Sequence, residues 1–442
     1  MEVIGLLGFL IALAVLIILI VKGMHLSYAA FISVLIIIAT NGMPLFATLG
    51  DYWGMVGMLA SMFLPMFLFG AIFAKVYTDS GAASSLTNAI MDFMAKLAKT
   101  DMGLKRISLI AMLGIGILMG YGGMDMIALI FLLIPIFANV LERADIPRRY
   151  LPSLVITGVI VSGVGAGAPQ QYNMMATSLA GVSGAAGFVP SLIGQIVILI
   201  SAYLFLMKGI KKAAEAGEHF EWGKLKAVSS NDEKHPNALL SLIPLLCVFL
   251  LYNLAHLDLA YSMLVGAVVT ILMFFPYFRA KETRFKSITA SLNAGVEDAA
   301  KPILCLPAFG IGSVIMAAPA CATLTNIVKA IPGPALISCT IMLILLVGLC
   351  ADPKAGVSIG VPISLEIYGG MGVSAGAIGR IAAFSMSVLD SLPIAAGMPM
   401  IISMCDLEFK EGYKPVFQTT VLSTLFGTLA AMIVLILFPG LA

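Results

Sequence analysis

The chain has 442 residues, of which 60% are hydrophobic and only 11% are charged, and its formal net charge is +2. Soluble proteins are about half apolar and about a quarter charged. The composition therefore excludes a soluble globular protein, a disordered chain, a coiled coil and a secreted disulfide scaffold. So small a net charge gives no reason to expect a nucleic-acid partner. The apolar composition predicts an all-α polytopic membrane protein, surrounded by lipid, in which each span takes about 20 apolar residues.

The apolar runs mark the predicted spans in chain order. The first half contains runs at 3–21, 26–41, 54–77, 107–141, 151–168 and 188–207. After a polar segment at 208–236, a second series follows at 239–254, 260–278, 302–318, 335–368, 376–402 and 416–440. Two runs in each half are interrupted by glycine and proline, which favour turns over continuous helix.

The two halves share sequence landmarks at matching places. Asp125 precedes Pro135 by ten residues, Asp352 precedes Pro362 by ten, and the two pairs are offset by 227 residues. This match predicts an internal duplication. The predicted parts are a first inverted repeat at 1–207, a cytoplasmic linker at 208–238 and a second inverted repeat at 239–442.

We expect each repeat to have inverted topology, with about five transmembrane helices plus one re-entrant hairpin, at 107–141 and at 335–368. An odd number of crossings gives the two repeats opposite orientations. With residue 1 outside, 22 of the 25 Lys and Arg residues fall in inside segments, as the positive-inside rule requires. Lys329, Lys354 and Arg380 are the basic residues that lie elsewhere.

Interrupted spans at matching places in two inverted repeats point to a transporter's binding site, because unwound backbone is tolerated in a membrane only where it lines a cavity. Helix N-termini at such breaks attract anions, and neutral side chains around Gln171 suit substrate hydroxyl groups. The alternative is close helix packing by small residues. The candidate substrate-binding residues are Gly122, Gly123, Asp125, Gly167, Pro169, Gln170, Gln171, Tyr172, Asn173, Asp352, Lys354, Ser385, Ser387, Asp390 and Ser391.

Few charged residues lie within the apolar runs, where a charge is costly and usually functional. Lys354 is a candidate cation for a substrate carboxylate, or a fixed substitute for a coupling ion. Alternatively, Asp352 and Lys354 neutralise each other. Asp125 and Asp390 are candidate proton carriers, because a buried carboxyl group readily takes up a proton.

Other notable residues are expected at the membrane interface. Arg380 and Glu366 lie near the ends of their segments, and Tyr52, Trp53 and Trp222 are typical interfacial anchors. The sequence contains neither the P-loop motif of ATP-driven pumps nor a metal-binding helix motif. We therefore expect no enzyme activity, no cofactor and no metal.

Three stretches resemble the gluconate permease (GntP) family of the ion transporter superfamily. They are Gly42-Met43-Pro44-Leu45, Phe69-Gly70-Ala71 leading into Asp79-Ser80-Gly81-Ala82-Ala83, and the turn Ala144-Asp145-Ile146-Pro147. The resemblance covers nearly the whole chain at low identity. It implies a proton-coupled symporter of sugar acids or related small carboxylates, a homodimer with an elevator-like transport domain, and a place in the bacterial inner membrane.

The chain also departs from that family at the predicted site. Ala168-Pro169-Gln170-Gln171 contains no histidine where the permeases carry a Pro-Pro-His-Pro type segment, and the second hairpin tip holds Asp352 and Lys354. Na⁺ therefore stays open as the coupling ion beside H⁺. A sodium/proton antiporter of the same superfamily is the alternative function, and an intramembrane enzyme or assembly factor is the alternative from another class.

Overall fold

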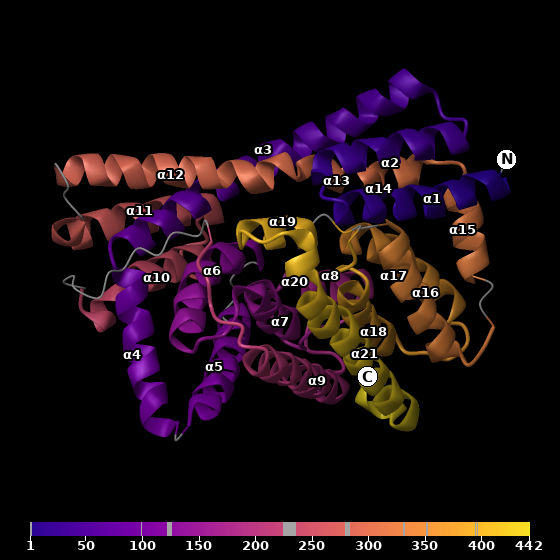
Figure 1. The fold of residues 1–442 in the computed structure, drawn as a ribbon. Helices are drawn as coiled ribbons and strands as arrows, with labels where there is room; N and C mark the ends of the chain where they lie inside the picture. Colours follow the sequence, from indigo (N-terminus) through magenta and orange to yellow (C-terminus); the bar gives the residue numbers. More distant parts are fainter. Residues whose placement is uncertain are drawn as a thin grey trace.

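The computed structural model describes residues 2–98, 100–121, 126–223, 236–278, 283–329, 332–350, 352–393, 395 and 397–442. Within these ranges the chain is helical and contains no strand, which confirms the all-α prediction. Figure 1 shows several helices running side by side along one edge, above a body of helices that come from both halves of the sequence.

The upper part, here called the long-helix layer, is built around two helices that pack along each other, α3 and α12. Helix α1 packs on α2, and α10 packs on α11, which also contacts α3. The bounds are α1 (Glu2–Val21), α2 (Leu26–Thr40), α3 (Leu45–Asp79), α10 (Ala238–Asn253), α11 (Leu259–Phe274), η2 (Phe275–Tyr277), α12 (Arg284–Leu304), α13 (Leu306–Phe309) and α14 (Ile311–Ala317). Two helices, α4 (Ala82–Leu97) and α15 (Ala320–Lys329), lead from this layer into the rest of the chain.

The lower part, here called the hairpin body, repeats one order of elements in each half: two helices joined as a hairpin, a broken helix and a long helix. The first set is α5 (Asp101–Tyr121), α6 (Met126–Arg143), η1 (Arg148–Tyr150), α7 (Leu151–Gly163), α8 (Gln171–Leu179) and α9 (Phe188–Glu215). The second set is α16 (Ala335–Cys350), α17 (Pro353–Ile367), α18 (Ala375–Val388), α19 (Gly397–Met404), α20 (Phe409–Val416), the π-helical η3 (Phe417–Leu422), α21 (Ser423–Leu437) and η4 (Pro439–Leu441).

The two sets of the hairpin body interlock. Helix α9 packs along α21, and α8 packs on α18, so each half of the sequence completes the packing of the other. The common order of elements agrees with the expected duplication, while the inverted relation of the two halves stays a prediction.

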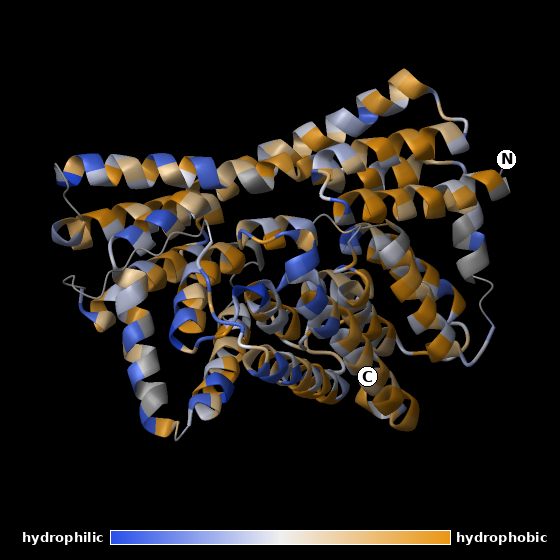
Figure 2. Ribbon diagram, in the orientation of Figure 1, coloured by the Kyte–Doolittle hydropathy of each residue, from blue (hydrophilic) through white to orange (hydrophobic). Residues whose placement is uncertain are grey.

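Within the described ranges, four helices are long and apolar enough to cross a membrane: α5, α9, the α11–η2 segment and the α20–α21 segment. A fifth candidate is α3, whose two parts meet at a 40° bend. Six shorter apolar segments, α2 among them, fall below the length of a full span. Apolar residues predominate along α1, α2 and α21 (Figure 2). These helices are consistent with a membrane protein, although fewer of the described helices reach full spanning length than the ten crossings expected.

The predicted interfacial anchors fall into different environments. Tyr52 is fully buried, and its hydroxyl donates to the carbonyl of Pro307 at 2.9 Å, so the expectation of an interfacial role for Tyr52 is wrong. Trp53 beside it is half-exposed. Trp222 donates its ring N–H to Glu142 Oε1 at 2.6 Å, and this bond helps to hold the segment after α9 against the end of α6.

Candidate functional site

The first break separates α7 from α8. Val164 caps the end of α7, and α8 starts at Gln171, so six residues between them lie outside any helix. Gly167 has φ +77°, a left-handed conformation that side chains other than glycine rarely adopt. The Gly-Ala-Gly-Ala-Pro sequence thus makes the unwound segment that the sequence predicted.

The first hairpin ends against this break. A Cβ atom at Gly120 would collide with the side chains of Ser162 and Gln170, so the last turn of α5 packs directly on the break. Gln195 of α9 donates to the Tyr121 hydroxyl at 2.8 Å and to Val161 O at 2.6 Å. The predicted tip residues Gly122, Gly123 and Asp125 lie outside the described residues.

The four polar residues at the start of α8 point in different directions. Gln170 is buried, and Gln171 is exposed. Tyr172 is buried and donates its hydroxyl to the carboxylate of Asp390. Asn173 is fully buried and donates to the carbonyl of Ala168 at 2.9 Å. Three of the residues predicted for this break are exposed and therefore accessible to a ligand: Gly167, Pro169 and Gln171.

The second hairpin turns at Asp352, which caps the N-terminus of α17. Its Oδ1 accepts the backbone N–H of Lys354 at 2.9 Å. The side chains of Asp352 and Lys354, both described and both half-buried, form no ion pair among those that the structure contains. The cap thus holds Lys354 through its backbone and leaves its ammonium group available.

The second break runs from the end of α18 at Val388 to the start of α19 at Gly397. Asp390 lies in this break, near enough to Asp352 and Lys354 to interact with their charges. Ser387 donates to the carbonyl of Phe384 at 2.7 Å. The hydroxyls of Ser385 and Ser391 are buried and have no hydrogen-bond partner in the part of the chain that the structure describes.

The described site residues therefore converge from both halves. The tip of the second hairpin reaches the second break, where Gly348 of α16 packs against Leu389. The bond from Tyr172 to Asp390 then joins the second break to the first. The N-termini of α8 and α17 lie where the two breaks meet. The free N–H groups and the positive dipole end of a helix N-terminus favour anions.

The expectation of an interfacial position for Arg380 was wrong. The side chain of Arg380 is fully buried in α18. Its guanidinium donates to the carbonyls of Val164, Gly184 and Ala186 and to Oδ1 of Asn173, at distances between 2.6 and 3.1 Å. Position near the start of a segment was misleading, because α18 is buried from its first turn, at every residue from Ala377 to Val388. Glu366, expected beside it at the interface, is exposed.

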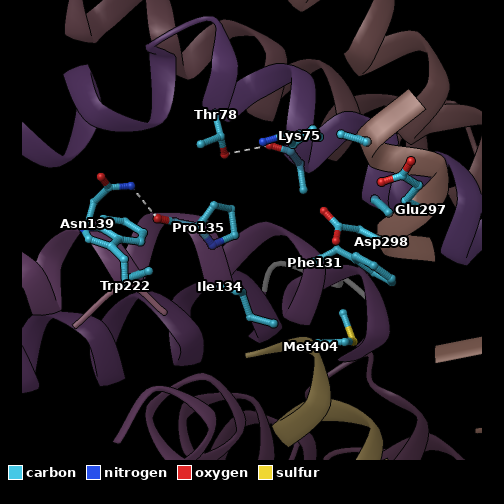
Figure 3. A pocket seen from close by; sticks show the side chains of 14 residues that line it. Lys75, Thr78, Phe131, Ile134, Pro135, Asn139, Trp222, Glu297, Asp298 and Met404 are labelled. Carbon is cyan, nitrogen blue, oxygen red and sulfur yellow. Dashed lines mark hydrogen bonds between the residues drawn. The ribbon is translucent and has the colours of Figure 1, made fainter. Parts of the chain in front are cut away.

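A cavity of about 320 Å³ lies between the long-helix layer and the hairpin body. Figure 3 shows Lys75 and Thr78 of α3 and the acids Glu297 and Asp298 of α12 facing Phe131 and Asn139 of α6. Lys75 is paired with Asp79 at 3.1 Å. None of the predicted site residues lines this cavity. The sequence did not predict this cavity because Glu297 and Asp298 lie between the predicted runs 260–278 and 302–318, while Asn139 lies within the predicted hairpin.

Comparison with known proteins gives one informative likeness. No protein-family model matches the chain. The chain is 21% identical over 444 residues to the "Uncharacterized transporter YxjC" of Bacillus subtilis (strain 168), with 89% of this chain and 90% of that protein covered. This likeness supports a transporter role and, together with the apolar helices, a membrane protein.

Proposed function

We propose that this protein is a secondary active transporter that carries small organic carboxylates, such as sugar acids or hydroxy acids, by proton-coupled symport. The observation that carries the proposal is the meeting of the two breaks through the hydrogen bond from Tyr172 to Asp390. We infer that the two interrupted helices, which come from separate halves, contribute to one binding site, the arrangement expected of a transporter.

The charges around this site favour an anion. The half-buried ammonium group of Lys354 lies on the first turn of α17, whose N-terminal end carries a partial positive charge. The exposed amide of Gln171 starts α8 on the other side. A carboxylate beside Lys354 and hydroxyl groups beside Gln171 would satisfy both ends of a hydroxy acid.

Asp390 is the proposed proton carrier among the described residues. As a carboxylate it accepts the hydroxyl of Tyr172. Protonation would remove a negative charge from the vicinity of Lys354, so the site would then hold an anionic substrate more tightly. Uptake of a proton and uptake of a carboxylate would thus favour each other, which is the requirement for symport.

The division into a long-helix layer and a hairpin body supports an elevator-type mechanism in our proposal. The site lies within the hairpin body, and the cavity between the two parts leaves space for one to move against the other. We further propose, from the resemblance to gluconate permeases, a homodimer in the bacterial inner membrane.

Purified protein in liposomes tests the proposed function with labelled D-gluconate and a panel of shorter hydroxy acids. We expect uptake driven by an inward proton gradient and abolished in Asp390→Asn. Uptake that follows a sodium gradient instead would assign Na⁺ as the coupling ion. Sodium/proton exchange without uptake of any carboxylate would contradict the proposal and favour the antiporter.

A further inference from the structure

The guanidinium of Arg380 uses all of its hydrogen-bonding capacity on α8 and on the two segments that flank it, the first break and the loop before α9. A guanidinium group has five N–H bonds, and Arg380 makes five hydrogen bonds, from Nε to Ala186 O, from Nη1 to Val164 O and Asn173 Oδ1, and from Nη2 to Gly184 O and Ala186 O. Three of the four acceptors are backbone carbonyls, and all four belong to the first half of the chain. Arg380 itself belongs to the second half.

This buried charge has no acidic partner. None of its acceptors is a carboxylate, and no ion pair in the described part of the chain includes Arg380. A buried charge is costly unless it is paired or fully hydrogen-bonded. Hydrogen bonds satisfy its donors here, but no carboxylate among the described residues forms an ion pair with it.

The contacts of Arg380 reach the proposed anion site through one side chain. Asn173 accepts from Arg380 with Oδ1 at 2.9 Å and donates from Nδ2 to Ala168 O at 2.9 Å. Ala168 lies in the unwound segment, two residues before the cap of α8. On the other flank, Gly187 has φ +62° and a Cβ there would lie 3.1 Å from Arg380 Cγ, so the loop before α9 passes directly over the arginine.

We propose that Arg380 is a positioning residue of the transport site, which holds the α7–α8 break from the opposite half of the chain and whose positive charge makes the site selective for anions. This inference rests on the proposed function. Arg380 does not touch the substrate. It fixes the N-terminus of α8 through Asn173 and adds a positive charge behind it, where the low dielectric of the interior weakens screening.

Two substitutions of Asn173 separate the charge from the hydrogen bonds. Both variants lose the bond from Asn173 Nδ2 to Ala168 O. Asn173→Asp keeps an oxygen for Arg380 and neutralises its charge, while Asn173→Ala also removes the acceptor of Arg380 and leaves its charge in place. If the charge is used, Asn173→Asp raises the KM for D-gluconate at least about ten-fold and more than Asn173→Ala does. If Arg380 only packs against its neighbours, Asn173→Asp should raise the KM for D-gluconate less than Asn173→Ala does. That order of KM values would overturn the proposal.

Arg380→Lys and Arg380→Met provide a second, independent pair. Both lose most of the five hydrogen bonds, so both lower the melting temperature, but only lysine keeps the charge. We expect Arg380→Lys to retain a KM within about three-fold of wild type, and Arg380→Met to raise it at least about ten-fold. Equal KM values for the two variants would contradict a role of the charge. A wild-type protein that takes up no carboxylate would instead refute the proposed function, so the two failures are distinguishable.

Discussion

Four consecutive polar side chains, Gln170 to Asn173, show how one turn of helix divides what looks like a single motif. The sequence predicted all four as substrate ligands. In the structure the side chain of Asn173 is hydrogen-bonded to Ala168 and Arg380, and the hydroxyl of Tyr172 is hydrogen-bonded to Asp390. Successive residues of an α-helix are rotated by about 100°, so only Gln171 faces outward. Residue types predicted a polar site, but direction depends on where α8 begins.

Gln171 is therefore the best test of hydroxyl recognition. We expect Gln171→Leu to weaken binding of a hydroxylated carboxylate by about 1–3 kcal/mol, because one buried substrate hydroxyl loses its partner. A deoxy analogue should bind wild type and variant equally. Competition against labelled D-gluconate in proteoliposomes measures both. Equal losses for the hydroxylated and deoxy compounds would count against this role.

Lys354 tests the proposed carboxylate contact. Lys354→Met keeps the apolar stem and removes the charge, so we expect loss of carboxylate uptake with normal membrane insertion and a normal elution volume in size-exclusion chromatography. The cap from Asp352 uses the backbone N–H of Lys354 and survives the substitution. Lys22→Met, at an exposed position after α1, is the matched control. Normal uptake by Lys354→Met would leave anion binding to the helix ends.

At the scale of elements, interrupted apolar runs were the most reliable signal. The runs 107–141 and 335–368 each contain two helices, the run 151–168 ends in a break, and the run 376–402 contains a break between α18 and α19. Glycine and proline fix these features locally, so the sequence is sufficient to predict them. Which breaks meet is set by packing of α8 on α18 and α9 on α21, and no local pattern carries that information.

Helix α12 shows where local reasoning failed. Residues 279–301 lie between the predicted spans 260–278 and 302–318, so they were expected as a connection on the inside. The structure has a continuous helix from Arg284 to Leu304, followed by two short helices that begin at Leu306 and Ile311. Gly295 of α12 packs closely on Ile72 of α3. An amphipathic helix beside a long partner can carry charges that would exclude it as a span.

The approach of α5 to α7 gives a prediction at this scale. A Cβ atom at Gly116 would lie 3.0 Å from the Cα of Gly158, whereas a Cβ atom at Gly114 meets nothing within 4 Å. Gly116→Ala should destabilise the protein by about 1–3 kcal/mol through overpacking. Gly114→Ala, on the same helix, should be neutral or slightly stabilising, since alanine favours helix over glycine. Thermal unfolding in detergent compares them, and equal melting temperatures would contradict the close approach.

At the scale of the whole molecule, the segment after α9 is fastened to the turn between α6 and α7. Asp145 accepts from His219 at 2.9 Å and from the backbone N–H of Phe220 at 3.1 Å, and Lys105 lies 3.8 Å from its carboxylate. Burial alone would raise the pKa of Asp145, but the hydrogen bonds from His219 and Phe220 and the charge of Lys105 outweigh it and lower that pKa.

This lowered pKa fixes the sign of a pH effect. A carboxyl group with a depressed folded-state pKa contributes stability above its unfolded pKa of about 4, and that contribution is lost as the pH falls through the folded value. Asp145→Asn should therefore have a lower free energy of unfolding than wild type at pH 7. The difference between the two free energies should become smaller below about pH 4. Asp92→Asn, from a more exposed pair with Arg143, should change little. A gap that does not depend on pH would contradict the assignment.

Relative movement of the two parts of the molecule can be tested by a crosslink. A Cβ atom at Gly70 of α3 would lie 3.1 Å from Phe131 of α6, so cysteines at these positions, with the six native cysteines replaced, bridge the long-helix layer and the hairpin body. Oxidation should abolish uptake and reduction should restore it. Cysteines at Val248 and Gly266, which join α10 to α11 within the layer, are the control. Undiminished uptake by the oxidised Gly70–Phe131 pair would refute the elevator proposal.

The bond between Arg380 and Asn173 also has a consequence for biosynthesis. These residues are 207 positions apart, and at about 5–20 residues per second the ribosome needs about 10–40 s to cover that distance. During this interval the carbonyls of Val164, Gly184 and Ala186 are without the donor that satisfies them in the finished protein. The first half of the nascent chain is therefore in the membrane before the hydrogen bonds from Arg380 can form. A chaperone or insertase that protects these carbonyls would act during this interval.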